Sequence, residues 1–382
     1  MAAVNPTSTP HLTPPLTEED LSDWLRLLRS RRVGITTFFR LMNEHGSASA
    51  ALEALPGIAR AAGVEAYATC PPDAVERELR AAAQAGVAWT AFGTADYPAD
   101  LAQLPDPPPL LACLGDISLL HRPMIALVGA RNASSLGTRM ARRLASELGE
   151  AGYIVVSGLA RGVDTAAHLA SLGTGTVAVM AGGVDIVYPS ENAVLAQEIG
   201  EKGLRISEQP MHHEPQARHF PRRNRIVSGL AKAVVVVEAA AKSGSLITAR
   251  TGLDQGREVL AVPGHPFDAR ASGCNMLIRD GAVLVRGAGD VIEALRREAP
   301  VAATREASPS DVPHAPAERR TLAEATALHS EILARLGPSP LAEDQLIRDL
   351  ARPAGEIAPE LVSLELEGKI RRQPGGLLSL AV

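Results

Sequence analysis

Four adjacent residues in the middle of the chain, Lys242, Ser243, Gly244 and Ser245, form a short loop that has the features of an anion site. The loop follows residues 233–237, an apolar, β-branched run that is typical of a strand buried on both faces of a parallel sheet. It also opens a predicted helix from residue 246. A loop in this position offers free backbone N–H groups and the positive end of a helix dipole. Since Lys242 adds a full charge, we expect the loop to bind an anion.

A basic segment, residues 218–225, precedes this strand and contains Phe220, Arg222, Arg223 and Asn224. Guanidinium groups form paired hydrogen bonds with phosphate oxygens, and an aromatic ring can stack on a nucleobase. We therefore predict a basic arm beside the anion loop, and such an arm favours a polyanion over a single mononucleotide. Glu238, at the end of the strand, is expected to orient the arm through hydrogen bonds and charge pairing.

Two further loops at predicted strand ends combine small residues with arginine. Their candidate phosphate contacts are Gly129 and Arg131 after residues 125–128, and Ser157, Gly158, Arg161 and Gly162 after residues 153–157. For the first loop, a plain strand-to-helix turn with a solvated arginine fits equally well. The G-x-G-x-x-G dinucleotide fingerprint is missing and no G-K-[ST] triplet occurs, so we do not expect nucleotide hydrolysis by a Walker-type loop.

Other polar residues near these loops have simple structural interpretations. Asp164 is placed to cap a helix that begins near Thr165. His168 lies one turn further on, and a packed histidine is favoured over an acid–base role. Tyr188 belongs to a third loop, residues 182–189, and could stack a base or pack in the interior with equal probability.

Composition restricts the class of protein. With 382 residues the chain should form more than one domain, and its 46% hydrophobic content is ordinary for a soluble protein. The net charge of −5 means that a nucleic-acid binder would have to concentrate its positive charge locally. The three cysteines show neither metal nor disulfide spacing, which fits a cytoplasmic protein without a metal or cofactor. No apolar run approaches the roughly 18 residues of a membrane span, and no signal peptide is evident.

From residue 125 the pattern alternates between strands and helices, which predicts a doubly wound, Rossmann-like, mostly parallel α/β sheet. The carboxyl ends of such strands converge on one crevice. The candidate loops should therefore meet in a positively charged groove that follows several phosphates of a single strand. The predicted organisation is a disordered tail at 1–16, a helical domain at 17–95, the Rossmann-like domain at 96–298, a linker at 299–320 and a small domain at 321–382.

The two flanking domains have their own resemblances. In the first, a helix, a glycine-containing turn and a second helix resemble the helix-hairpin-helix and sterile-alpha-motif-like families, although a helical bundle used for packing or partner contact is favoured. In the last, helices at 323–336, 342–351 and 358–367 and a hairpin at 368–380 resemble a winged helix. Its presumed recognition helix is acidic, which favours protein contact over DNA contact.

Five ordered motifs, at 125–131, 157–168, 220–230, 236–249 and 262–264, resemble the DNA-processing protein A family, DprA or Smf. The resemblance implies a homodimer that binds and protects single-stranded DNA. It also implies that the protein helps to load the RecA recombinase in natural transformation and recombination. The positions that match the family's motifs are Arg131, Ser157, Gly158, Arg161, Phe220, Arg222, Arg223, Asn224, Lys242, Ser243, Gly244 and Ser245. The chain departs from the family at Ala130, where serine is commoner. Apolar patches near Leu230 and at residues 276–278 are candidates for the dimer contact.

Two other classes of protein remain as alternatives. The sheet also resembles the lysine-decarboxylase-like phosphoribohydrolases, which cleave nucleotide monophosphates with a P-G-G-x-G-T loop followed closely by a catalytic glutamate. Here the corresponding segment is S-G-S-L-I-T-A-R, and no carboxylate follows before Asp254. Without a placed acid or base, we do not expect an enzyme. An interaction scaffold with vestigial phosphate loops is the third possibility.

Overall fold

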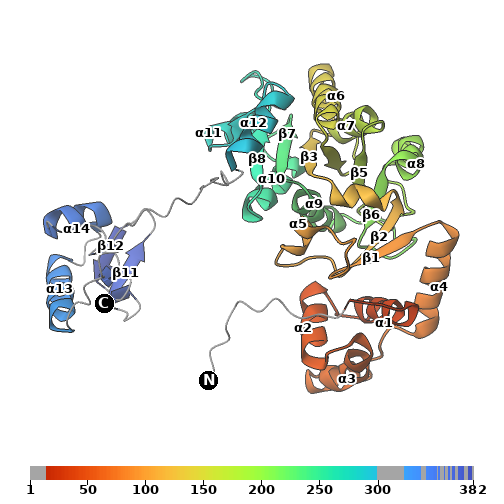
Figure 1. The fold of residues 1–382 in the computed structure, drawn as a ribbon, viewed down its shortest axis with the longest axis horizontal. Helices are drawn as coiled ribbons and strands as arrows, with labels where there is room; N and C mark the ends of the chain where they lie inside the picture. The colour runs from red at the N-terminus through yellow and green to blue at the C-terminus, as the bar shows by residue number, and fades with distance from the viewer. Residues whose placement is uncertain are drawn as a thin grey trace, which may run out of the picture. The chain divides into compact units, whose positions relative to one another are not determined.

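The computed structural model describes residues 14–298, 322–336 and 341–350, and beyond these residues 352, 357, 360–361, 364–365, 369–373 and 377–380. The chain separates into two units, Met1–Ala303 and Thr304–Val382 (Figure 1). The predicted linker and most of the predicted tail lie outside the described residues. Within the described part, none of the helices is both long and apolar enough to cross a membrane.

The first unit begins with four helices: α1 Glu18–Arg29, α2 Ile35–His45, α3 Ala48–Ala61 and α4 Pro72–Gln84. A capping box starts α1, in which Thr17 and Asp20 satisfy each other's backbone N–H groups. Trp24 and Phe38 meet edge to face in the core of this bundle, with ring centroids 5.0 Å apart. Gly34 lies in the turn between α1 and α2, at the cap of α2, whereas Pro56 and Gly57 lie inside α3. The helix α4 was not predicted.

Nine strands form the central sheet, in the order β1-β2-β6-β5-β4-β3-β7-β8-β9. The pairs β1/β2 and β2/β6 are antiparallel and the remaining neighbours are parallel. The strands are β1 Ala88–Ala91, β2 Leu110–Gly115, β3 Met124–Gly129, β4 Ile154–Ser157, β5 Thr176–Val179, β6 Leu204–Ser207, β7 Ala233–Val237, β8 Glu258–Ala261 and β9 Val283–Leu284. The doubly wound, mostly parallel sheet is confirmed, whereas β1, β2 and β6 were missed.

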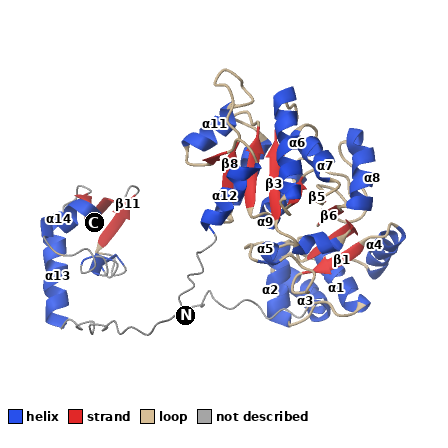
Figure 2. Cartoon of the chain, turned by 45° about the horizontal axis from the view of Figure 1, so that its top comes forward, coloured by secondary structure: helices blue, strands red, loops and turns tan. Residues whose placement is uncertain are grey.

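Helices cover both faces of this sheet (Figure 2). The alternating side chains of β7 show why: Val235 and Val237 pack with α6, α7 and α12, while Val234 and Val236 pack with α9, α10 and α11. Short 3-10 turns lie at Ile117–His121 and Ser190–Asn192. The covering helices are α5 Ala99–Ala102, α6 Ser135–Glu150, α7 Val163–Ser171, α8 Ala193–Lys202, α9 His219–Leu230, α10 Gly244–Asp254, α11 Ser272–Arg279 and α12 Ala288–Glu298.

The predicted basic arm is the first half of helix α9, not an extended segment. Arg225 faces inward from this helix, ion-pairs with Glu208 and lies 3.3 Å from the carboxylate of Asp106. Leu230, proposed as part of a dimer contact, is 2% exposed and belongs to the core beneath α9, so that proposal was wrong. The other candidate patch, residues 276–278, is half-buried against the same core.

The second unit is a winged-helix domain. It contains α13 Leu322–Arg335, α14 Glu343–Leu350 and a three-stranded sheet in the order β10-β12-β11. The strands are β10 Leu341–Ala342, β11 Ile370–Gln373 and β12 Leu377–Leu380, so the predicted hairpin is present. Of the predicted helix at 358–367, residues 360–361 and 364–365 are described and are helical.

The position of α9 leads to a prediction about stability. Replacing Arg225 by alanine should lower the free energy of unfolding by about 3 kcal/mol, because the carboxylate of Glu208, whose side chain is only 13% exposed, loses its partner. Urea unfolding followed by tryptophan fluorescence measures this, since both tryptophans lie in the first unit. Arg222→Ala, on the exposed face of the same helix, is the control and should change stability by less than about 0.5 kcal/mol. Equal effects of the two substitutions would contradict the assigned role of the ion pair.

Candidate nucleic-acid interface

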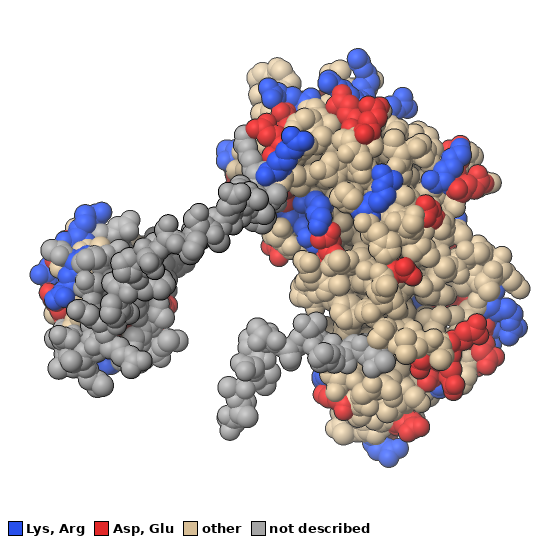
Figure 3. Space-filling view, viewed as in Figure 1, with Lys and Arg blue, Asp and Glu red and all other residues tan. Residues whose placement is uncertain are grey.

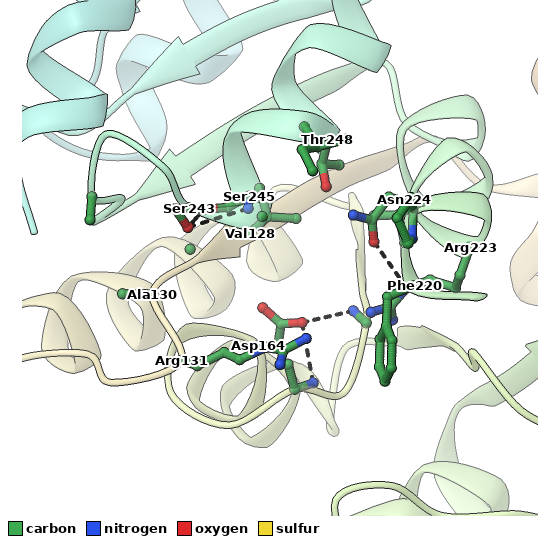
Figure 4. A pocket seen from close by; sticks show the side chains of 18 of the residues that line it. Val128, Ala130, Arg131, Asp164, Phe220, Arg223, Asn224, Ser243, Ser245 and Thr248 are labelled. Carbon is green, nitrogen blue, oxygen red and sulfur yellow. Dashed lines mark hydrogen bonds between the residues drawn. The ribbon is translucent and has the colours of Figure 1, made fainter. Parts of the chain in front are cut away.

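The carboxyl ends of β3, β4 and β7 open onto a groove of about 760 Å³ (Figure 4). β4 lies on one side of β3 and β7 on the other, so the groove is at the point where the strand order reverses. The sequence-predicted residues that line it are Gly129, Arg131, Gly158, Phe220, Arg223, Asn224, Lys242, Ser243, Gly244 and Ser245. The structure thus brings together loops that are more than 100 residues apart in the chain.

One end of the groove is the amino terminus of α10. Ser243 caps this helix, and its hydroxyl accepts a hydrogen bond from the Ser245 amide at 3.3 Å and lies 2.6 Å from the Ser245 hydroxyl. The amides of a first helical turn have no acceptor within the helix. Together with the exposed Lys242 ammonium, this end of the groove suits an anion.

Arg131 and Phe220 form a second feature of the groove. The guanidinium of Arg131 lies over the face of the Phe220 ring, 5.3 Å from its centroid. Arg131 is exposed and Phe220 is half-buried, so the ring supports a charge that remains free to meet a ligand. Figure 4 shows both side chains at the rim that is formed by the β3 loop and α9.

Arg223 reaches the groove but is only 6% exposed. Its Nη1 donates to the carbonyl of Val179 at 2.7 Å and its Nε donates to Asn224 Oδ1 at 3.1 Å. The guanidinium lies against Gly158, where a Cβ atom would come within 1.9 Å of it. Burial lowers the pKa of Arg223 to about 10, against the attraction of Asp164, so the side chain remains charged at neutral pH. Its main contacts are internal.

Asp164 lines the groove, and its role differs from the predicted helix cap. Its Oδ2 accepts hydrogen bonds from the amides of Gly158 and Ala160, each at 3.2 Å, and α7 already begins at Val163. It therefore holds the preceding loop and does not cap the helix. Burial raises the pKa of this carboxyl, and the charge of Arg223 opposes that shift. The only signal in the sequence was a single acidic residue among small, apolar neighbours. Asn132, Thr248 and Arg270 also line the groove and were not predicted.

Four predicted site residues do not line the groove. Ser157 is fully buried and donates its hydroxyl to the carbonyl of Leu127 at 2.6 Å, which rules out the expected phosphate contact. Gly162 packs against the β3 loop, with a positive φ of 80°. Arg161 lies in a neighbouring hollow beside Tyr188 and pairs with Glu191 at 3.6 Å. Arg222 is exposed on α9, outside the residues that line the groove.

Gly129 and Glu238 have structural roles that differ from those expected. A Cβ atom at Gly129 would lie 1.9 Å from the carbonyl of Val237, so this glycine allows β3 and β7 to approach each other. The carboxylate of Glu238 accepts hydrogen bonds from the amide and hydroxyl of Ser134, the cap of α6, and does not orient α9. These interactions hold the loop around Arg131 between β3 and α6.

The packed histidine is confirmed. His168 is fully buried, and its Nδ1 lies 2.7 Å from the Thr176 hydroxyl.

Tyr188 is 52% exposed, and its ring centroid lies 5.7 Å from that of Phe220. On the face drawn in Figure 3, lysine and arginine side chains form separate patches with aspartate and glutamate between them. On this face, positive charge is therefore confined to small patches and does not form one continuous surface.

Three family models match the chain. They are DNA recombination-mediator protein A over residues 88–296, the DprA-like N-terminal HHH domain over 18–81 and the DprA winged helix domain over 315–376. Among curated proteins, the chain is 42% identical to the DNA processing protein DprA of Bacillus subtilis over 222 residues, 57% of this chain and 75% of that one. It is 37% identical to the protein Smf of Escherichia coli over 293 residues, 74% of this chain and 75% of that one.

Two solved structures are similar in fold. The X-ray structure of DNA processing protein A from Streptococcus pneumoniae matches with a TM-score of 0.57 and 32% identity, covering 71% of this chain and 92% of that one. DNA processing protein A from Helicobacter pylori, which was studied for its single-stranded DNA binding mode, matches with a TM-score of 0.51 and 30% identity. That match covers 55% of this chain and 96% of the other.

The buried histidine behind the groove predicts a pH dependence of stability. Burial lowers the pKa of His168 to about 3, from an ordinary value of 6.5. Between these values the unfolded chain binds a proton that the folded chain does not, so stability falls as pH decreases from 6.5. Replacement by glutamine should remove about 1.4 kcal/mol per pH unit from this slope. Urea unfolding of both proteins at pH 6.0, 5.5, 5.0 and 4.5 measures the difference. Parallel slopes would show that His168 is not held neutral.

Proposed function

Because the chain belongs to the DNA recombination-mediator protein A family, whose members process DNA during recombination, we propose that it binds single-stranded DNA in the groove at the strand ends. The observation that supports this most directly is the meeting of Arg131, Lys242, Phe220 and the amino terminus of α10 in one groove. The single-stranded DNA binding of the Helicobacter pylori relative is consistent with it.

In this proposal the exposed charges of the groove bind phosphates, and the buried charge fixes its shape. Arg131 and Lys242 are exposed and face the phosphates, and the first amides of α10 bind the phosphate nearest to them. The charge of Arg223 is largely offset by Asp164, so this residue shapes the groove more than it attracts DNA. Phe220 supports Arg131 on one side, while its remaining exposed surface can stack a base. Phosphate contacts of this kind give little base specificity.

We further propose that binding protects the strand and assists the loading of RecA recombinase, as the family resemblance implies. In this proposal the protein acts in the cytoplasm as a homodimer, with the half-buried residues 276–278 of α11 as the candidate dimer contact. The winged helix contributes a partner contact.

We also propose that the protein is not an enzyme. One observation favours the alternative phosphoribohydrolase: the groove contains Asp164, a buried carboxyl whose pKa is raised by burial. Against catalysis, this carboxylate is already held by two loop amides and faces a buried guanidinium. Its contacts suit a residue that fixes a loop.

Neutralising the exposed charges should weaken DNA binding. Arg131→Ala and Lys242→Ala should each raise the Kd for a dT20 oligonucleotide roughly tenfold and make the slope of log K against log salt shallower by about 0.7. Fluorescence anisotropy between 50 and 300 mM NaCl measures both quantities. Arg143→Ala is the matched control, because Arg143 is exposed on α6, pairs with Glu147 and lies outside the groove. If Arg131→Glu bound the oligonucleotide as tightly as the parent protein, the proposal would fail.

A nucleotide assay separates the two candidate functions. We expect no release of free base from AMP, GMP, CMP or dTMP in the presence of the protein, together with retention of single-stranded DNA in a gel shift. Turnover of a monophosphate that Asp164→Asn abolishes, without a shifted strand, would establish the enzyme instead.

A further inference from the structure

A second pocket, of about 260 Å³, lies between helix α8 and strands β2 and β6. We call it the α8 pocket. It is lined by Leu114, Val187, Ala193 and Gln197, and by Arg205 at one wall, with Gly200 and Glu201 beside it. None of these residues lines the DNA groove. Its volume is slightly below the range of about 300–1,000 Å³ that is usual for ligand sites, so its ligand would be small.

Arg205 lies on strand β6 beneath helix α8, a buried position at which an apolar side chain is usual. Its neighbours on β6, Leu204 and Ile206, are fully buried in the core on the other face of the sheet. Arg205 points instead toward α8 and is only 9% exposed. A Cβ atom at Gly200 would lie 3.4 Å from Nε and Nη2 of Arg205, so the guanidinium packs directly against this turn of α8.

One nitrogen of this guanidinium, Nε, is buried and lacks an acceptor among the described residues. No carboxylate of the described part of the chain lies within ion-pair distance of the guanidinium. Burial lowers the pKa of Arg205, and the attraction of Asp185 only partly opposes this. A buried, charged donor without an acceptor is unfavourable, and an anion that accepted a hydrogen bond from it would remove this cost.

Glu201, the acid of α8 that lines this pocket, has another partner. Glu201 is exposed, and its Oε1 accepts a hydrogen bond from Gln197 at 3.0 Å. Both residues stand at the wall of the α8 pocket. Glu201 therefore adds negative charge to the wall of the pocket without bonding to the guanidinium of Arg205.

We propose that the α8 pocket binds a small organic oxyanion, a carboxylate or phosphate monoester carried on a short apolar body. Arg205 binds the charged group, and Leu114, Val187 and Ala193 contact the apolar part. Guanidinium groups recognise both kinds of oxyanion in the same bidentate geometry. The site is separate from the DNA groove and does not depend on DNA binding.

Thermal unfolding of the full chain in the presence of butyrate or propyl phosphate tests this, with chloride at equal ionic strength as the reference. We expect at least one of the two anions to raise Tm in proportion to the logarithm of its concentration above Kd, by about 3 °C at a hundredfold excess over Kd. The comparison between them identifies the class of oxyanion. Arg205→Met should remove the response without lowering the Tm of the unliganded protein, because it replaces an unpaired buried charge by a side chain of similar length. Arg279→Met, at an exposed arginine on α11, should retain the response.

Further variants exclude the remaining explanations. Glu201→Gln should lower the Kd of the anion several-fold, and Ala193→Leu should fill the pocket and abolish the response without altering Arg205. The proposal is overturned if neither anion raises Tm beyond chloride, if Arg205→Met responds like the parent, or if it unfolds at a lower temperature than the parent. It is equally overturned if Arg205→Met weakens binding of dT20 as strongly as Arg131→Ala does, because Arg205 would then belong to the path of the DNA strand.

Discussion

The guanidinium of Arg223 joins parts of the chain that are far apart in sequence. From helix α9 it donates to the end of β5 at Val179, lies against Gly158 after β4 and faces Asp164 at the start of α7. Removing a charge of this kind from water is expensive, so it is tolerated only where carbonyls and a carboxylate surround it. These contacts hold α9 and the β4 loop in fixed positions, and the groove lies between them and α10. The groove therefore depends on an interaction that itself contributes little net charge to a ligand.

Around the groove, the residues that hold the loops in place are different from the residues that a ligand can reach. Gly129 and Gly158, which the motif suggested as places where a phosphate approaches the backbone, are instead required by the neighbouring Val237 carbonyl and the Arg223 side chain. Glu238 fixes the cap of α6. Exposed cations remain at Arg131 and Lys242, where desolvation is small and a ligand can reach them. In a chain with a net charge of −5, this local arrangement is what makes an anion site possible.

Two buried arginines, Arg225 and Arg205, differ in the hydrogen-bond and ion-pair partners that surround them. Arg225 is surrounded by acceptors, with Glu208 and Asp106 as its partners, and it anchors α9. Arg205 is as deeply buried on β6 but lacks a partner at Nε among the described residues, and it borders a pocket. Their sequence neighbourhoods differ, since Arg225 ends a basic segment and Arg205 is flanked by Leu204 and Ile206, but neither neighbourhood shows which side chain has a partner. The difference arises from what the neighbouring strands and loops place opposite each side chain.

The sequence by itself determined the parallel core of the sheet, since runs such as residues 233–237 are apolar at every position and only burial on both faces explains that pattern. It also determined which loops lie at the carboxyl ends of these strands, and hence most residues of the groove. It did not reveal β6, where Arg205 and Ser207 interrupt the apolar pattern, or helix α9, whose arginines resembled an exposed arm. Only the tertiary structure decided which of these polar groups are free and which are already bonded. Hydrogen bonds such as Ser157 to Leu127, or Arg223 to Val179, join residues 30 and 44 positions apart. Their formation depends on strand order, which local sequence does not encode.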